Sequence, residues 1–296
     1  MPKIIMFVGP PGSGKSTRAK DLIYNDGDHG LATIYINQDT QGKDGHMTLF
    51  LKALADKKDV IVDRMNFSKE QREKYLVPAK AVGYQSEIIV YHVPFDICMF
   101  RCLSRPDHKT IKTQEDASRA INFFFSKYER VEDTEADVIY RDYGNLKLKD
   151  NAIWVDMDNT LSDTTHREHF LSSDKKKNWK GFFDAMGDDP VNEWCKKLIQ
   201  GMNNIAKVLI VSARPDNYRK VTESWLLHHS IPYDSLIMRK HGDFRRDDIV
   251  KEILYEFEIF PRYNLLFSVD DRKQVINRIR THGVTVLDCA GDKGDF

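Results

Sequence analysis

The sequence predicts an α/β protein of two domains, each a mainly parallel sheet covered by helices. Short apolar runs alternate with stretches of helical periodicity over residues 1–140, a pattern that is typical of parallel strands joined by helical crossovers. The same alternation restarts over residues 152–296, after a polar stretch at 141–151 that we interpret as a linker. The chain of 296 residues is long enough for two such domains.

The individual elements follow from this periodicity. In the first domain we expect strands at 3–9, 32–37, 59–63 and 86–93, and helices at 15–24, 68–83, 94–103 and 114–130. Ser68 is the expected N-cap of the second of these helices. In the second domain we expect strands at 152–156, 207–212, 235–239, 264–270 and 284–289, and helices near 217–228, 246–257 and 273–282.

Composition excludes some functional classes. Basic and acidic residues balance at 45 each, so a nucleic acid would have to bind a local groove and not a basic tail. No apolar run is long enough to span a bilayer, and the first residues lack a secretory pattern. We therefore expect no membrane association and a cytoplasmic location. The four cysteines form no C-x-x-C pair and are expected to be free thiols.

The stretch "GPPGSGKS" at residues 9–16 fits the phosphate-binding pattern G-x-x-x-x-G-K-[ST] in full, between an expected strand and an expected helix. Its glycines allow backbone N–H groups to surround phosphate oxygens at the helix N-terminus. We expect Lys15 to reach the β- and γ-phosphates and Ser16 to bind Mg²⁺. The expected ATP-binding residues are Gly9, Gly12, Ser13, Gly14, Lys15, Ser16 and Thr17.

Two aspartates follow the next expected strands of this domain. Asp39 comes at the end of the second strand and Asp63 at the end of the third. Carboxyl ends of parallel strands face the nucleotide cleft, so one carboxylate can help to hold Mg²⁺ and the other can take a proton from an attacking hydroxyl. An isolated aspartate at such a place is more often a turn or cap residue, but a pair beside a P-loop favours function.

Arg101 and Arg105 are four residues apart, one helical turn, in "FRCLSRPDHK". Phosphoryl transfer needs positive charge on the transferring group, and both side chains could reach over the ATP from a helix. The alternative is a solvated helix face, which is the usual place of an arginine pair.

The second domain opens with "IWVDMDNTLS", which places Asp156 and Asp158 directly after a buried strand. In an extended turn residues i and i+2 point the same way, so the two carboxylates can converge on one site. An aspartate can attack a phosphoryl group when Mg²⁺ shields its charge, and a second aspartate can protonate the leaving oxygen. Alone, this pair is a weak signal.

Further candidate site residues follow along the second domain. A hydroxyl and a cation, Ser212 and Arg214, end a later strand, and Lys251 lies on an expected helix. Asp270 and Asp271 end another strand and are hard oxygen ligands for Mg²⁺. Together with Asp156 and Asp158 these residues resemble all four motifs of the haloacid-dehalogenase superfamily of phosphatases. Asn159 stands where that superfamily often has glycine, and asparagine tolerates the left-handed backbone of such a turn.

A P-loop domain followed by such a phosphatase domain resembles the phage T4-type polynucleotide kinase/3′-phosphatases, the end-healing enzymes, over nearly the whole chain. The resemblance implies a P-loop kinase fold, then a haloacid-dehalogenase-like fold with a small cap. It also implies transfer of the ATP γ-phosphate to 5′-hydroxyl ends, removal of 3′-phosphates, and opening of 2′,3′-cyclic phosphates as an option. Implied partners are RNA or DNA ends, a ligase acting on the same ends and, as an option, a second copy of the chain.

The resemblance also implies roles for single residues. Asp39 would be the general base on the 5′-hydroxyl, Asp63 would contact the acceptor, and Arg105, with Arg101 before it, would cover the ATP phosphates. Asp156 would be the nucleophile and Asp158 the general acid and base. The phosphate would be served by Arg167, Ser212, Arg214, Arg239 and Lys251, and the metal by Asp156, Asp158, Asp270 and Asp271, with Arg272 beside them.

Two departures from the family concern the substrate. The family has an arginine three residues after the general base, where this chain has Gly42, with Lys43 adjacent. The cap segment at 161–190 is also unlike that of the T4-type enzymes. Its Trp179, Phe182 and Phe183 could stack on a base or could form a packed cap core.

Three functions therefore remain open from the sequence. The first is an end-healing enzyme for RNA or DNA. The second is a kinase and phosphatase for a nucleoside or another small hydroxyl compound, which the neutral charge allows. The third is a nucleotide-binding switch or scaffold, against which Asp39 and Arg105 argue because a scaffold needs no phosphoryl-transfer residues.

Overall fold

The computed structural model describes residues 1–25, 33–42, 44–105, 111–144, 149–171 and 177–290. The chain divides into two compact units, unit 1, Met1–Asn145, and unit 2, Leu146–Phe296. Lys43 and residues 145–148 of the expected linker lie outside the described residues. Strand β5 (Val138–Asp142) and strand β6 (Asp150–Val155) both extend into the stretch expected to be linker, so its polar composition overstated its length.

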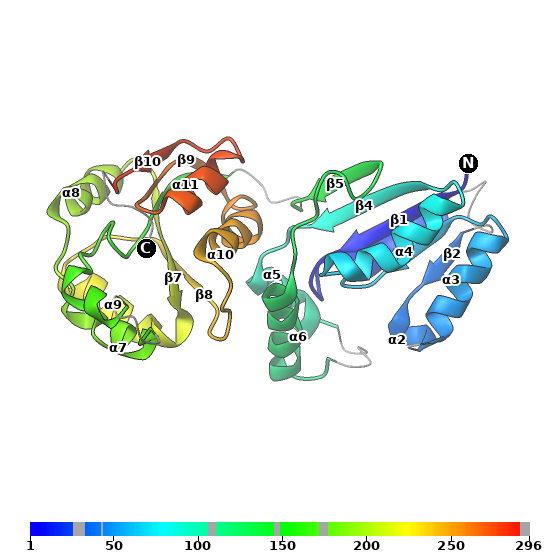
Figure 1. The fold of residues 1–296 in the computed structure, drawn as a ribbon, viewed down its shortest axis with the longest axis horizontal. Coiled ribbons are helices and arrows are strands. Elements are labelled where there is room, and N and C mark those ends of the chain that lie inside the picture. Colours follow the sequence, from blue (N-terminus) through cyan, green and yellow to red (C-terminus); the bar gives the residue numbers. More distant parts are fainter. Residues whose placement is uncertain (26–32, 43, 106–110, 145–148, 172–176, 291–296) are drawn as a thin grey trace. The chain divides into compact units, whose positions relative to one another are not determined.

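Unit 1 contains a five-stranded parallel sheet of order β2-β3-β1-β4-β5. The strands besides β5 are β1 (Lys3–Val8), β2 (Ile34–Ile36), β3 (Val60–Asp63) and β4 (Gln85–Tyr91). The helices are α1 (Lys15–Asn25), α2 (Gln38–Gln41), α3 (Gly45–Ala55), α4 (Lys69–Ala81), α5 (Phe95–Leu103) and α6 (Gln114–Lys127). Helix α3 lies beside strand β2 of this sheet, and helix α4 packs on β1 and β4 (Figure 1).

Unit 2 repeats the architecture with the order β10-β9-β6-β7-β8, again all parallel. The strands besides β6 are β7 (Lys207–Pro215), β8 (Ser235–Arg239), β9 (Tyr263–Asp270) and β10 (Val286–Asp288). The helices are α8 (Glu193–Met202), α9 (Arg219–His228), α10 (Asp247–Leu254), which continues into the π-helix η4 (Tyr255–Ile259), and α11 (Lys273–Arg280). The predicted class, two α/β domains with parallel sheets, is confirmed.

A group of short helices lies between β6 and α8, in the predicted cap segment. They are η1 (Thr165–Phe170), α7 (Trp179–Asp184) and η2 (Met186–Asp188), and a further short helix, η3 (Asp216–Tyr218), follows β7. Helix α7 packs tightly on η1, because a Cβ on Gly181 would lie 2.8 Å from the ring of Phe170. This contact fixes the orientation of α7.

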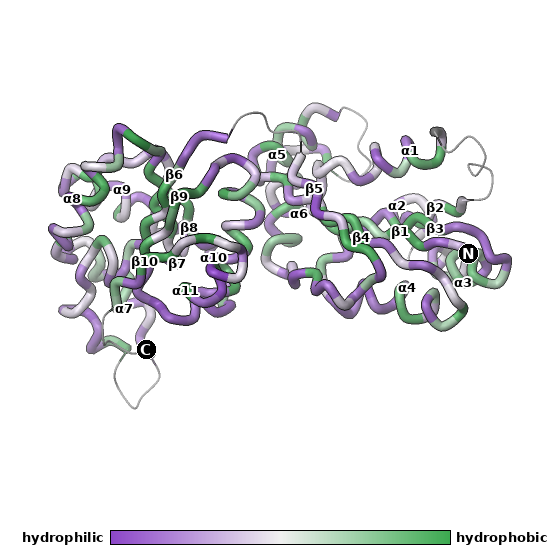
Figure 2. Tube along the Cα trace, turned by 90° about the horizontal axis from the view of Figure 1, so that it is seen from above, coloured by the Kyte–Doolittle hydropathy of each residue, from purple (hydrophilic) through white to green (hydrophobic). Residues whose placement is uncertain are grey.

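The cores explain why the strands read as nearly continuous apolar runs. In β6, Ile153 and Val155 pack in one cluster with residues of α8 and α9, whereas Trp154 packs in a second cluster with residues of α11. Side chains of a strand alternate between faces, so a sheet covered on both faces is apolar at successive positions. Figure 2 shows the hydrophobic colour concentrated along the strands of each unit.

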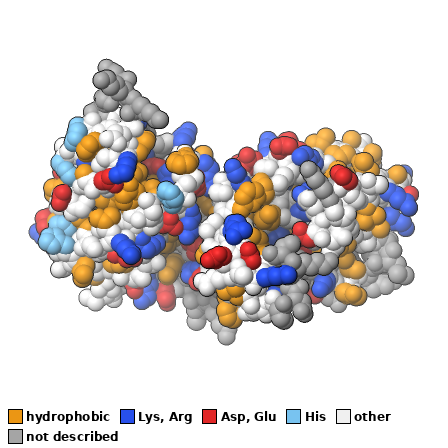
Figure 3. Space-filling view, turned by 90° about the horizontal axis from the view of Figure 1, so that it is seen from below, with side chains coloured by type: hydrophobic (Ala, Val, Ile, Leu, Met, Phe, Trp, Pro, Cys, Tyr) orange, Lys and Arg blue, Asp and Glu red, His pale blue; other side chains and the backbone are white. Residues whose placement is uncertain are grey.

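Several elements were not expected from the sequence. Helices α2, α3, α7 and α8 lie in segments to which we assigned no element, although α8 carries a regular apolar pattern that includes the buried Cys195 and Ile199. The N-cap predicted for α4 is present, since the Ser68 Oγ accepts a hydrogen bond from the Gln71 N–H (3.3 Å). None of the described helices is both long and apolar enough to cross a membrane. On the face shown in Figure 3, basic and acidic side chains are interspersed.

Candidate active sites

The first candidate site is the P-loop, which connects β1 to α1. Gly12 and Gly14 have φ angles of 80° and 106°, which disfavour any side chain. A Cβ on Gly12 would also lie 2.4 Å from the Cys98 carbonyl oxygen, so the loop needs glycine to pack against α5. The loop is thus held open for backbone N–H groups to face a ligand at the N-terminus of α1.

The Lys15 side chain lies inside the loop and bonds to it. Its ammonium donates to the carbonyl oxygens of Gly9 (2.8 Å) and Pro10 (2.7 Å) and to the Ser13 Oγ (3.2 Å). All three acceptors are neutral, so burial lowers the pKa of Lys15 to about 8, and the negative charge of Asp63 opposes the shift only in part. A buried ammonium with neutral partners is suited to an anionic ligand such as a nucleotide phosphate.

Asp63 ends β3 and is buried at 4% exposure. Its carboxylate accepts hydrogen bonds from the Tyr35 hydroxyl (2.5 Å) and the Asn37 side-chain amide (3.4 Å). Burial, together with the bond to this carboxylate, raises the pKa of Tyr35, which keeps the hydroxyl a donor. Asp63 is therefore oriented by two side chains that the sequence reasoning did not single out.

Asp39 lies in the first turn of α2 and not at the end of β2, where we expected it. Its side chain is exposed. Asn37 joins the two aspartates, because its Oδ1 accepts from the Asp39 backbone N–H (2.9 Å) while its Nδ2 contacts Asp63. An asparagine just before a short helix is a recognisable N-cap signal, and that signal could have revealed α2.

Arg64 braces this region from the other side. Its guanidinium donates to the Gln38 side chain and to the Tyr75 hydroxyl (2.7 Å), so it ties the end of β3 to α2 and α4. Gly42 ends α2 with a φ of 78°, and no atom lies within 4 Å of a Cβ placed there.

The two arginines expected over the phosphates are placed differently from each other. Arg101 is in the last turn of α5 and its guanidinium donates to the Ser13 carbonyl oxygen of the P-loop (3.4 Å). Arg105 lies beyond Leu103, where α5 ends. The two residues therefore do not share a helical face, contrary to our expectation. The positive charge of Arg105 still acts on Lys15, whose pKa it helps to lower.

The second candidate site is at the carboxyl edge of the unit 2 sheet. Lys251, on α10, lies between two buried carboxylates, with Nζ 2.7 Å from Asp156 Oδ1 and 2.7 Å from Asp270 Oδ2. Asp156 follows β6, and its N–H donates to the Val269 carbonyl oxygen of β9 (3.0 Å), so neighbouring strands bring these groups together. The structure brings these three expected site residues together.

The charges of this centre do not balance. Burial raises the pKa of Asp156 well above its ordinary range, and the charges of Asp270 and Asp271 add to this while Lys251 opposes it. Burial and the charge of Asp270 likewise raise the pKa of Asp271 to about 7. Three carboxylates share one ammonium, so the centre lacks positive charge.

A divalent cation fits this deficit. Oxygen atoms of Asp156, Asp270 and Asp271 lie within 4.8 Å of one another, and the buried Oδ1 of Asp271 has no hydrogen-bond partner among the described residues. Carboxylate oxygens are the ligands that Mg²⁺ prefers. The side chain of Asp158, the fourth expected metal ligand, is not part of this group but is turned to two arginines.

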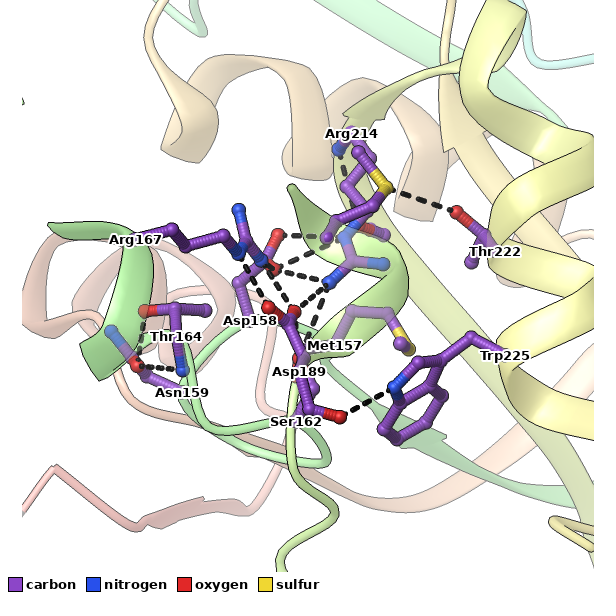
Figure 4. A network of polar contacts seen from close by, with 12 residues as sticks. Met157, Asp158, Asn159, Ser162, Thr164, Arg167, Asp189, Arg214, Thr222 and Trp225 are labelled. Atoms are coloured by element: carbon purple, nitrogen blue, oxygen red, sulfur yellow. Dashed lines mark hydrogen bonds and ion pairs between the residues drawn. The ribbon is translucent and has the colours of Figure 1, made fainter. Parts of the chain in front are cut away.

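Figure 4 shows this second half of the site. The Asp158 carboxylate accepts from Arg167 NH2 (2.5 Å) and from Arg214 NH2 (2.6 Å) and Nε (3.0 Å). Burial opposes ionisation, but the charges of Arg214 and Arg167 outweigh it and hold the pKa of Asp158 well below its usual range. Asp156 and Asp158 therefore serve two adjacent subsites with different partners.

Asp189 is the residue of this site that sequence reasoning missed. Its buried carboxylate accepts from Arg167 Nε (2.6 Å) and NH2 (2.6 Å), from Arg214 NH2 (2.9 Å) and from the Ser162 hydroxyl (3.1 Å). Both arginines are thus fixed between two carboxylates, and NH1 of Arg214 is buried without a partner among the described residues. Arg167 also lies over the Phe182 ring, at 4.0 Å from its centroid.

The loop after β6 is shaped by Asn159. It has a φ of 60°, and its Oδ1 accepts from the Thr164 hydroxyl (2.6 Å). The prediction that asparagine supports this turn agrees with that geometry. Ser212 is fully buried beside the arginines, and its hydroxyl accepts from the Arg214 N–H (3.1 Å).

Arg239, expected to serve the phosphate, is engaged elsewhere. Its guanidinium pairs with Asp247 and donates to the carbonyl oxygens of Asp243 (3.2 Å) and Arg245 (3.0 Å). Arg272 pairs with the other oxygen of Asp247. Asp247 therefore pairs with two arginines at the start of α10, the helix that carries Lys251. An aspartate in the first turn of an expected helix is the sequence signal that could have indicated this role.

Comparison with known proteins assigns both units. Residues 150–296 match the family model of the polynucleotide kinase PNKP phosphatase domain, and residues 4–126 match the model of an AAA domain. The transcription factor bHLH140 of Arabidopsis thaliana is 30% identical over 112 residues, 36% of this chain and only 12% of the plant protein.

Two solved structures are similar to this chain at low identity and low TM-score. A chain of the Pnkp1/Rnl/Hen1 complex is 23% identical, with 97% of this chain and 96% of that chain covered and a TM-score of 0.42. Kti12 of Chaetomium thermophilum, in complex with ADP-AlF3, is 18% identical, with 47% and 87% covered and a TM-score of 0.37.

The two family matches cover the two candidate sites, the P-loop in one and the aspartate–lysine centre in the other. A kinase domain implies a nucleotide phosphate donor, and the phosphatase domain usually works with a divalent metal. The chain thus joins a P-loop-bearing AAA domain to a domain that belongs to the polynucleotide kinase phosphatase family.

Proposed function

We propose that this protein heals broken nucleic-acid ends, by transferring the γ-phosphate of ATP to 5′-hydroxyl ends of RNA or DNA and by removing 3′-phosphates. The observation that carries the proposal is the Asp156–Lys251–Asp270 centre in a domain of the polynucleotide kinase phosphatase family, on the same chain as a complete P-loop. The kinase would add a phosphate to a 5′ end that lacks one, and the phosphatase would remove the phosphate that blocks a 3′ end.

In unit 1 the P-loop amides and Lys15 would hold the phosphates of ATP, with Ser16 on Mg²⁺. Asp39 is exposed in the first turn of α2 and would take the proton of the 5′-hydroxyl. Asp63, oriented by Tyr35, would hold the acceptor. Arg101 already contacts the P-loop, and Arg105 would add positive charge at the transferring phosphoryl group.

In unit 2 an oxygen of Asp156 would attack the phosphorus of the 3′-phosphate, while the bond to the 3′-oxygen breaks and that oxygen takes a proton from Asp158. Water would then attack the aspartyl-phosphate, give its proton to Asp158 and release inorganic phosphate. Mg²⁺, held by Asp156, Asp270 and Asp271, would supply charge neutralisation for the approach of the two anions. Lys251 and the Ser212 hydroxyl would hold phosphoryl oxygens.

Asp158 can carry a proton only if its two arginines release it in part. Arg167 and Arg214 also donate to Asp189, and these bonds would hold them if they turned from Asp158 to a phosphate oxygen. A bound phosphate would therefore compete with Asp158 for the arginines and prepare Asp158 as the general acid.

The products are 5′-phosphate and 3′-hydroxyl ends, which are the ends that a nucleic-acid ligase joins. We therefore place such a ligase as the functional partner.

The test is a transfer assay with labelled ATP on matched RNA and DNA oligonucleotides that carry 5′-hydroxyl and 3′-phosphate ends. Asp39→Asn should abolish kinase activity and leave the phosphatase, and Asp156→Asn should do the reverse. If either change removed both activities, the two-site proposal would be wrong. A nucleoside acceptor and a nucleoside 3′-phosphate in parallel distinguish a polynucleotide enzyme from one for small substrates.

A further inference from the structure

The cap of unit 2 carries a row of three aromatic rings. Trp179 and Phe183, one turn apart on α7, are nearly parallel, with centroids 5.9 Å apart and planes at 26°. Phe183 continues to Tyr218 of η3, at 5.3 Å and 37°. We call Trp179, Phe183 and Tyr218 the aromatic row.

The aromatic row is not a closed core. Trp179 is 46% exposed, Phe183 and Tyr218 are half-buried, and the packed position of α7 is filled instead by Phe182, at 8% exposure. Partly exposed rings with planes at 26° and 37° to one another form a surface on which a flat aromatic ligand can stack.

The row is held rigidly. Gly181 packs α7 against Phe170, and the Tyr218 hydroxyl donates to the Asp184 carboxylate (3.2 Å), which also pairs with Lys180. Rings that are already ordered lose little conformational entropy when a ligand stacks on them.

The row also adjoins the phosphate end of the site. Phe182 packs edge-on against both Trp179 and Phe183, and its own ring is covered by the Arg167 guanidinium at 4.0 Å. Arg167 is one of the two cations that hold Asp158, and Tyr218 follows four residues after the other, Arg214. One side chain, Phe182, therefore separates the row from Arg167.

We propose that the aromatic row is a nucleobase subsite of the phosphatase, on which the base of the 3′-terminal nucleotide stacks while its 3′-phosphate reaches the arginine pair. The inference rests on the proposed function and adds to it: the row makes the enzyme select nucleotide 3′-phosphates over phosphates without a base. The ammonium of Lys177, 5.8 Å from the Trp179 ring centroid, provides a cation for the adjoining phosphodiester.

The experiment compares two 3′-phosphorylated oligonucleotides that differ only in whether the terminal nucleotide has a base or is abasic. The full-length wild type should dephosphorylate the base-containing substrate with a kcat/KM about tenfold higher. Trp179→Ala should lower kcat/KM for that substrate about tenfold and leave the abasic one unchanged, while Trp179→Phe should restore most of the preference. Trp194→Ala is the matched control, because Trp194 is exposed to 48% on α8, outside the row.

The outcomes separate the two proposals. A wild type that removes both 3′-phosphates equally well, or a Trp179→Ala change that lowers both equally, overturns the subsite and leaves the proposed function standing. A wild type that removes neither 3′-phosphate overturns both. If Trp179→Ala does not fold, Tyr218→Ala tests the same preference at the other end of the row, and an unchanged preference there also overturns the subsite.

Discussion

The two candidate active sites bury their lysines in opposite surroundings. Lys15 of unit 1 donates only to neutral oxygens of its own loop, whereas Lys251 of unit 2 lies between the carboxylates of Asp156 and Asp270. Burial therefore lowers the pKa of Lys15 to about 8. At Lys251 burial acts in the same sense, but the two carboxylates outweigh it and raise the pKa above its ordinary value.

This difference shows what each site lacks. The P-loop has a cation without an anion, so an anionic ligand completes it. The unit 2 centre has more carboxylates than cations, so a metal ion completes it. A lysine of the first kind contributes to ligand binding and little to folding, whereas one of the second kind also holds the fold together, because its loss leaves buried carboxylates unpaired.

The largest effect is therefore expected from Lys251→Met. Phosphatase activity should fall by about 10³-fold or more, and the free energy of unfolding of unit 2 should drop by about 3–5 kcal/mol because Asp156 and Asp270 lose their partner. All four tryptophans belong to unit 2, so denaturant unfolding followed by tryptophan fluorescence reports on this unit alone. Lys207→Met, which breaks the exposed pair with Asp234, should cost less than about 1 kcal/mol. Equal losses in the two variants would contradict the comparison.

The same substitution at the other site should separate activity from stability. Lys15→Met should lower kinase activity by about 10²–10³-fold, yet change the stability of unit 1 by about 1 kcal/mol or less, since no charge is left unpaired. Phosphatase activity should be unchanged. The measurements are ATP transfer and the hydrogen exchange of unit 1 amides without nucleotide. A stability loss as large as that of Lys251→Met would show that Lys15 is a structural residue.

A third change tests the arginines that lie between carboxylates. Asp189→Asn leaves Arg167 and Arg214 with one ionised partner, Asp158, in place of two. We expect kcat of the phosphatase to fall by about 10–100-fold, because the arginines bind Asp158 more firmly and release it less readily to a phosphate. The neighbouring Asp188→Asn is the control, because Asp188 is exposed and lies outside the network of Asp158, Asp189 and the two arginines as the described residues form it. A fall in KM alone, with kcat intact, would speak against this role of Asp189.

The contrast between the two sites also explains which site residues could be predicted from the sequence. The P-loop is contiguous, so its pattern placed Lys15 and Ser16 without any knowledge of the fold. The carboxyl ends of strands placed Asp156 and Asp270 in one centre, because parallel strands end at one edge. Lys251 was expected from the helix that follows. Here local pattern and tertiary arrangement give the same answer.

Other residues depend on contacts that no local pattern encodes. Asp189 is recognisable only once Arg167 and Arg214 are seen to converge on it from η1 and β7. Arg239 follows a strand end, as phosphate-binding residues do, but Asp247 holds it. Arg105 lies past Leu103, the expected and observed end of α5, so its spacing of four from Arg101 is not a helical turn. For Asp189 and Arg239 a charged partner brought near by the fold decides the position of the side chain.

The smallest expected effect is the pH dependence of nucleotide binding. With a folded-state pKa of about 8, Lys15 loses its proton as pH rises from about 7 to about 9, and the Kd for ATP should increase up to about tenfold over that range. Lys15→Arg does not titrate there and should bind with little pH dependence, as measured by calorimetry. The stability of unit 1 should increase with pH, whereas its affinity for ATP decreases. Between about 8 and 10.5 the unfolded chain binds more protons at this residue than the folded one, so unit 1 without nucleotide should gain stability as pH rises. No increase of the Kd above pH 8 would mean that Lys15 keeps its proton among neutral partners, and the contrast with Lys251 would then lie in geometry and not in charge.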